Sequence, residues 1–264
     1  MRTTTKVSQL VVCLALTAAD FHVLAAKEPL YDCLGSYSRR ITTKSSEAQK
    51  YFDQGLGFLQ GFNHRAAIRA FEQAAALDPD CAMAHWGIAQ ACGPHINSMT
   101  VPPPAAQLAW TELGLAQKNV DNASPVERAL IGALAKRYAN PQPEDRSGLD
   151  RTYADAMREV WKKYPKDPDV GAFFAEAMMN LRPWDQWRPD GKPQPGTEEI
   201  IATLDAVLTL SPNHPLANHL YIHALEASPN PERATVAADR LRNLQPGLSH
   251  NVHMPSHIDI RTGQ

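Results

Sequence analysis

The side chains of this sequence best suited to chemistry are its histidines. The 264-residue chain contains ten, and six of them lie in its last fifth. His219 and His223 are four residues apart in the segment NHLYIHALEAS, and His253 and His257 have the same spacing in HMPSH. Positions i and i+4 share one face of a helix, so each pair can bind a metal ion through two imidazole nitrogens. His250 lies one turn before His253 and is a fifth candidate ligand.

The second pair follows the first at an offset of 34 residues. In a chain built from helical repeats of that length, equivalent positions lie on neighbouring helices, whose axes pack roughly 8–10 Å apart. We therefore expect the four imidazoles to converge and to bind one or two transition-metal ions. Zinc, copper and iron all accept imidazole, and the sequence does not select among them. Pro255 interrupts the second pair and, by removing a helix hydrogen bond, re-aims the side chains beside it.

Glu226 lies three residues after His223, on the same face of the predicted helix. It can complete the ligand set, act as a base toward metal-bound water, or orient a histidine ring through a hydrogen bond. The second role makes Glu226 the candidate catalytic residue. Asn218 and Asp259 are weaker candidates. The H-E-x-x-H motif of zinc proteases is absent, because Leu220 stands where the glutamate would be.

The spacing of small and aromatic residues predicts the helices that position these groups. Seven residues match the 34-residue tetratricopeptide (TPR) pattern, namely Tyr51, Gly55, Phe58, Ala67, Phe71, Ala74 and Pro79. They predict helices over 48–61 and 64–77, with Asn63 as N-cap of the second. A capping box, Ser124 to Glu127, opens a later helix. Further helices are predicted over 82–91, 104–120, 125–138, 149–164, 170–181, 197–210, 215–227, 231–244 and 249–262.

The chain resembles bacterial TPR-containing proteins, many of which are exported. The resemblance is carried by AQKYFDQGLGFLQGFNHRAAIRAFEQAAALDPDCAMAHWGIA, NHLYIHALEASPNPERATVAADRL and HMPSHI, and it covers most of residues 34–262. It implies an all-α, TPR-like α-solenoid of about five helical pairs plus a terminal unpaired helix. Both histidine pairs would then face a concave groove, where a protein or peptide ligand binds. Relatives are longer, which implies that the array is truncated at Gln264 in this chain.

Composition and the first residues of the chain bear on where the protein works. With 44% hydrophobic residues, 20% charged residues and a net charge of −2, it has the composition of a globular protein and lacks the basic balance of a nucleic-acid binder. No apolar run reaches the roughly 18 residues that would insert stably in a membrane. Arg2 and Lys6 precede an apolar stretch over 10–19, a pattern typical of a signal peptide. We expect a signal peptide over 1–26, an extension over 27–47, a repeat domain over 48–264, and a periplasmic or extracellular location.

The cysteines and tryptophans leave alternatives open. Cys81 and Cys92 are about 16 Å apart along one predicted helix, too far to bridge each other. Cys33 either pairs with one of them, or all three are reduced. Trp184 and Trp187 either cover the groove as a lid or fill a gap between helical pairs. His95 is either a further ligand or a solvated loop residue.

Three functions are compatible with these residues. The first is an exported interaction scaffold whose histidine-lined groove binds a transition metal. The second is a metal-dependent oxidoreductase or hydrolase that uses the same histidines. The third is a peptide-binding TPR protein without metal, in which the histidines supply polar contacts only.

Overall fold

The computed structural model describes residues 27–264, and every regular element in that range is a helix. The predicted signal peptide lies outside the described residues. The expected all-α class is confirmed for the part that is described. The α-helices are α1 (Ser46–Gln60), α2 (His64–Leu77), α3 (Ala82–Ala91), α4 (Pro103–Lys118), α5 (Pro125–Leu134), α6 (Ser147–Lys163), α7 (Pro168–Asn180), α8 (Thr197–Leu210), α9 (Pro215–Leu225), α10 (Thr235–Leu244), α11 (Ser249–His253) and α12 (Pro255–Thr262). Short 3-10 helices are η1 (Asp32–Leu34), η2 (Val120–Asn122) and η3 (Pro231–Ala234).

Most helices begin and end within a few residues of their predicted positions, and the differences have local causes. The helix predicted over 249–262 is divided into α11 and α12, because Pro255 has no N–H to continue the first of them. The helix predicted to reach residue 138 already ends at Leu134. The capping box is confirmed, since the Glu127 carboxylate accepts a hydrogen bond from the Ser124 N–H. Asn63 is the N-cap residue of α2 as predicted, but its side chain makes no capping hydrogen bond.

Small residues let neighbouring helices approach closely at the start of the chain. Gly55 on α1 and Gly87 on α3 both lie against the ring of Phe71 on α2. A Cβ atom at either glycine would come within 2.6 Å of that ring, far inside van der Waals contact. The aromatic and alanine positions of the predicted repeat are buried around them. The spacing of glycine and phenylalanine therefore sets how closely α1, α2 and α3 pack.

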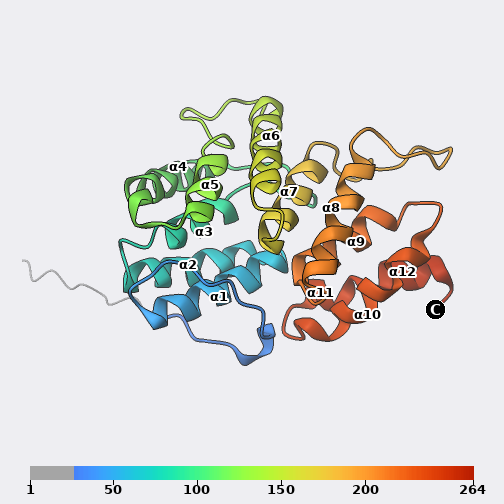
Figure 1. Ribbon diagram of the computed structural model, residues 1–264, viewed down its shortest axis with the longest axis horizontal. Coiled ribbons are helices and arrows are strands. Elements are labelled where there is room, and N and C mark those ends of the chain that lie inside the picture. Colours follow the sequence, from blue (N-terminus) through green and yellow to red (C-terminus); the bar gives the residue numbers. More distant parts are fainter. Residues whose placement is uncertain (1–26) are drawn as a thin grey trace, which may run out of the picture.

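Consecutive helices contact one another along the chain, and together the helices α1 to α12 curve into an arc (Figure 1). Helix α9 also contacts α1, although more than 150 residues separate them in the sequence. Gln245, just after α10, donates to the carbonyl oxygens of Leu34 and Gly57 at 3.3 Å each, and the Gly247 N–H donates to Cys33 at 2.8 Å. The last helices therefore lie against the first, and the arc is closed on itself.

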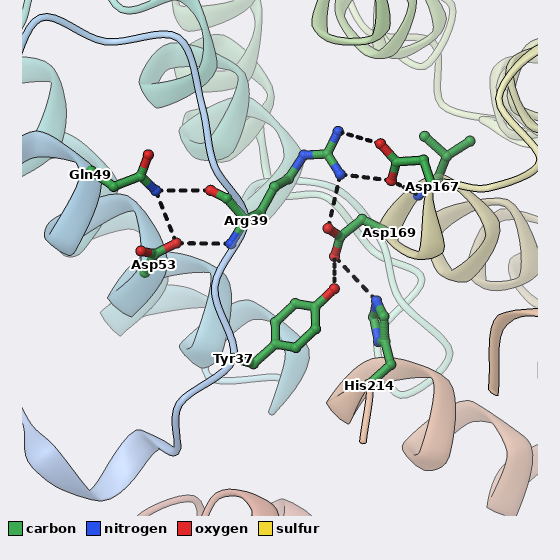
Figure 2. Close-up of polar contacts among 8 residues, drawn as sticks. Tyr37, Arg39, Gln49, Asp53, Asp167, Asp169 and His214 are labelled. Atoms are coloured by element: carbon green, nitrogen blue, oxygen red, sulfur yellow. Dashed lines mark hydrogen bonds and ion pairs between the residues drawn. The ribbon is translucent and has the colours of Figure 1, made fainter. Parts of the chain in front are cut away.

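A buried polar cluster fastens the extension before α1 to the starts of α7 and α9 (Figure 2). Arg39 forms ion pairs with Asp167 at 2.8 Å and with Asp169 at 2.9 Å. Asp169 also accepts hydrogen bonds from the Tyr37 hydroxyl at 3.0 Å and from His214 Nε2 at 3.2 Å. The other ring nitrogen of His214 accepts from the Ala217 N–H and so caps α9. We call the four residues Tyr37, Arg39, Asp169 and His214 the clasp.

The structure also bears on the cysteines and on membrane insertion. Cys33, Cys81 and Cys92 are all free, so the alternative of three reduced thiols is confirmed within residues 27–264. Burial raises the pKa of Cys81 to about 11 and that of Cys92 to about 12, which keeps both thiols protonated. Among the described helices, none combines the length and the apolar character needed to cross a bilayer.

Candidate metal centre

Three of the predicted ligands meet where α9 and α11 lie against the end of α1. His219 and His223 are buried on α9, and His250 on α11 is partly buried. Each offers a ring nitrogen, and these nitrogens lie within 4.8 Å of one another. The residues His219, His223 and His250 are called the three-histidine site below. Three imidazoles at this spacing can bind one transition-metal ion.

The ring of His219 is fixed by a backbone carbonyl from the first helix, at the other end of the arc. Its Nδ1 lies 3.1 Å from the Gln60 oxygen at the end of α1, a contact that requires the N–H on this nitrogen. The tautomer therefore leaves a lone pair on Nε2. That atom lies 3.1 Å from Nε2 of His250. Without a metal, a single proton between the two nitrogens makes this contact a hydrogen bond.

Glu226 fixes two further rings in the same way. One carboxylate oxygen accepts from Nδ1 of His223 at 2.8 Å, and the other accepts from Nδ1 of His257 at 2.6 Å. Both imidazoles then carry their lone pair on Nε2. The Nε2 atom of His223 is buried and has no hydrogen-bond partner among the described residues. These contacts support the orienting role predicted for Glu226. Its carboxylate also lies within 4.8 Å of ring nitrogens of His223 and His257, so it can complete a ligand set, and its role as a catalytic base stays a prediction.

The protonation states suit metal binding at neutral pH. Burial, reinforced by the neighbouring imidazoles, lowers the pKa of His219 well below its usual value and that of His250 to about 4. Burial also lowers the pKa of His223, although Glu226 opposes this. For Glu226, burial would raise the pKa, but the hydrogen bonds from His223 and His257 outweigh it and lower the pKa. The neutral ring of His223 therefore faces an ionised carboxylate, and no proton has to leave a cationic imidazole at His219, His223 or His250 before a metal binds.

The second predicted pair is placed differently from the first. His257 on α12 reaches Glu226, whereas His253 at the end of α11 lies further out and is exposed. The division of the helix at Pro255 changes the direction of the chain, so His250, and not His253, meets His219. The weaker candidates are engaged elsewhere. The Asn218 amide donates to the carbonyl oxygens of Pro212 and His214, and Asp259 pairs with Arg242.

Sequence reasoning missed an aromatic ring at the centre of the cluster. Phe62 packs against His64, His95, His219 and His250, with ring centroids 4.4 to 5.9 Å apart. Its φ of 55° lies in the left-handed region, which a bulky side chain rarely adopts. Trp184, with φ of 61°, is the other non-glycine residue with positive φ in the described range. It packs edge-on against His223. Strained backbone tends to mark functional sites, and both instances here contact the histidines.

His95 belongs to the same cluster and is held there by its loop. Its ring stacks on His64 with centroids 4.2 Å apart, and its Nδ1 is buried without a partner among the described residues. The preceding carbonyl, of Pro94, accepts hydrogen bonds from the buried side chains of Arg137 at 2.5 Å and Asn180 at 3.3 Å. Burial, followed by the influence of His64, lowers the pKa of His95 to about 3. His95 is therefore not a solvated loop residue, because its ring packs against Phe62 and His64.

Each of the two tryptophans has one of the two predicted roles: Trp187 fills a gap between helices, and Trp184 covers the site. The indole N–H of Trp187 donates to the Ala224 carbonyl at 2.8 Å, and the ring fills a gap beside α9. Trp184 is 56% exposed and covers His223. It borders a cavity of about 150 Å³ that is also lined by Ile96, Met179, Gln186, His223, Glu226, Ala227 and Arg261. One ring of the three-histidine site can therefore be approached by a small molecule.

Comparison with known proteins finds no relative from which a function could be inferred. No protein-family model matches the chain, and no curated protein matches it.

Proposed function

We propose that this protein binds a transition-metal ion through Nε2 of His219, His223 and His250. The observation that carries the proposal is the fixed orientation of two of the three rings, those of His219 and His223. Gln60 and Glu226 each accept the Nδ1–H of one ring, and the nitrogens that remain lie close together. Metal-bound histidines normally donate their other N–H to a carbonyl or carboxylate, which sets the tautomer and the ring angle. Both kinds of acceptor are present here.

The spacing of the nitrogens supports the same function. With metal–nitrogen bonds of about 2.0–2.1 Å, two ligand nitrogens are about 3.3 Å apart in a tetrahedral site and about 2.9 Å apart at a right angle. The 3.1 Å between Nε2 of His219 and Nε2 of His250 lies between these values. An ion would thus replace the proton shared by the two rings with little movement of either.

We propose that the surrounding helices form a TPR-like array of about five pairs, which binds a protein or peptide partner after export. The array is supported by the 34-residue pattern and by the glycine contacts to Phe71. Export is supported only by the pattern of residues 1–26. In this proposal the metal stabilises the closed arc, because its ligands lie on α9 and α11 beside α1.

Elemental analysis of the purified protein, produced without an affinity histidine tag, tests the metal site. We expect at least one tightly bound equivalent of zinc, copper or iron in the wild type. The equivalent should be lost in His219→Gln/His250→Gln, which keeps side-chain volume but removes two ligand nitrogens. His85→Gln, on α3 and outside the cluster, controls for the loss of a histidine as such. Circular dichroism establishes that each variant is folded.

A wild-type protein that binds none of these ions after incubation would contradict the metal site. The histidines would then be polar contacts, and the metal-free peptide-binding function would be the better explanation. A tight equivalent that survives in the folded double variant would also contradict it, because the ion would have to lie elsewhere.

The cavity beside Trp184 favours a metal-dependent enzyme as a second candidate function. Catalytic metal sites keep three protein ligands and one open position, whereas structural sites are closed by four. A volume of about 150 Å³ accommodates a ligand the size of benzene. Arg261 lines the cavity and makes no ion pair among the described residues, so an anionic substrate is favoured.

Azide titration of the cobalt-loaded protein tests whether a small anion reaches an open position. We expect the visible absorption of Co²⁺ to change with azide, because azide would enter its coordination shell. Arg261→Gln should weaken azide binding several-fold, whereas Arg240→Gln, which removes a charge outside the cavity, should not. An absorption spectrum that azide leaves unchanged would exclude an accessible open position and favour the interaction scaffold.

A further inference from the structure

His253 and His257 form a second close pair of imidazoles on the outer side of Glu226. Their Nε2 atoms lie 3.1 Å apart, the same separation as between His219 and His250. The ring planes are inclined at 74° with centroids 4.9 Å apart, so the two rings are not stacked. The short distance between the two Nε2 atoms puts both of them within reach of one ion.

Both rings of this outer pair have a neighbour that leaves Nε2 free. His257 donates its Nδ1–H to Glu226, which places its lone pair on Nε2. The Ser256 hydroxyl lies 3.3 Å from Nδ1 of His253 and can donate to it while Nε2 of His253 donates its proton to His257. An ion that replaces this shared proton leaves the N–H of His253 on Nδ1, where the Ser256 hydroxyl can accept it. This is the arrangement already described at the three-histidine site, with Glu226 common to both.

The environment of the outer pair differs from that of the inner site in one respect. The side chain of His257 is 24% exposed and His253 is exposed, whereas His219 is fully buried. Two imidazoles leave further coordination positions to water, which the exposed location supplies. Fewer protein ligands and easy access predict weaker binding and faster exchange than at the three-histidine site.

We infer that Nε2 of His253 and Nε2 of His257 form a second transition-metal position, joined to the three-histidine site by Glu226. The inference rests on the proposed function in that both positions take the same class of ion, a divalent metal that accepts imidazole. The carboxylate of Glu226 lies between them, since it is hydrogen-bonded to one ring of each. Its negative charge offsets the repulsion between two cations, so both positions can be filled together.

Equilibrium dialysis of the tag-free protein against Co²⁺ or Zn²⁺ counts the ions and distinguishes the two positions. We expect two equivalents in the wild type, one tight and one weaker. His253→Ala should lose only the weaker equivalent. Because His253 is exposed, this change leaves the fold intact, which circular dichroism checks. His219→Gln/His250→Gln should lose only the tight equivalent, and His85→Gln should keep both.

The outcomes separate the second position from the proposed function. A wild type with one equivalent that His253→Ala leaves in place would overturn the second position and support the three-histidine site. A single equivalent lost in His253→Ala but kept in His219→Gln/His250→Gln would overturn the three-histidine site and support the outer one. Two equivalents that are both insensitive to His253→Ala would also overturn the second position.

Discussion

Replacement of Asp169 by alanine is expected to lower the free energy of unfolding by about 3–5 kcal/mol, because it leaves a buried charge without one of its partners. Asp169 is 3% exposed and accepts from Tyr37, Arg39 and His214 at once. Its loss would leave the Tyr37 hydroxyl and the His214 N–H without their acceptor, and Arg39 with Asp167 alone. Chemical denaturation with unchanged m-value measures the effect.

Two variants calibrate this measurement. Tyr37→Phe removes one hydrogen bond from the clasp and should cost about 1 kcal/mol. Asp155→Ala removes an exposed ion pair with Arg158 and should cost about 1 kcal/mol or less. A cost for Asp169→Ala no greater than that for Asp155→Ala would show that the clasp contributes little to stability.

The clasp also predicts how the wild-type stability responds to acid. Burial would raise the pKa of Asp169, but His214 and Arg39 outweigh it and lower the pKa to about 2. The pKa of an unfolded aspartate is about 3.9, so the folded state binds its proton less readily. This stabilisation is complete above the unfolded pKa and is lost as the pH falls from about 4 to about 2. Asp169→Ala should show a shallower loss of stability across this interval.

Glu226→Ala is expected to weaken metal binding about 10–100-fold, the usual effect of removing a carboxylate that orients a histidine ligand. The change frees the Nδ1 atoms of His223 and His257 together, so either ring can adopt the tautomer with its proton on Nε2. Competition with a chromophoric chelator measures the dissociation constants. Both metal positions should be affected, since each contains one of the two rings.

Glu226→Gln tests in the same experiment whether one side chain orients both rings. An amide has one acceptor oxygen, so it can orient only one of the two rings, and its NH2 group favours the wrong tautomer of the other. We expect one position to keep most of its affinity and the other to weaken. Glu232→Gln, which neutralises an exposed carboxylate on η3, should change neither. If Glu226 were a direct ligand, the cobalt spectrum of Glu226→Gln would report a changed coordination shell.

The local part of the fold could be predicted from the sequence because its causes are local. The spacing of Gly55 and Phe71 and the Ser124 capping box act within a helix or between adjacent ones. The i,i+4 spacing correctly placed His219 and His223 on one face. The 34-residue offset failed for His253, because equivalent register requires an unbroken helix and Pro255 divides it.

The rest of the candidate site depends on contacts between distant segments. Gln60 and Phe62 meet His219 across 159 and 157 residues, and no periodicity within the sequence encodes that distance. The left-handed backbone at Phe62 and Trp184 has no sequence signal, because glycine and asparagine are the residues expected there. Proximity of His64 and His95 to the site follows from the same closure of the arc.

The closure of the arc has a consequence for how the molecule opens. In an open repeat array each unit contacts only its neighbours, so units fray one after another from an end. Here the His219 ring on α9 is hydrogen-bonded to the Gln60 carbonyl in the last turn of α1. The Gln245 side chain, after α10, is hydrogen-bonded to the carbonyl oxygens of Leu34 and Gly57. Exposing the amides of α9 to solvent therefore also breaks contacts with the first helix. Hydrogen exchange should show α1 and α9 opening as one cooperative unit, with similar protection despite their distance in the sequence.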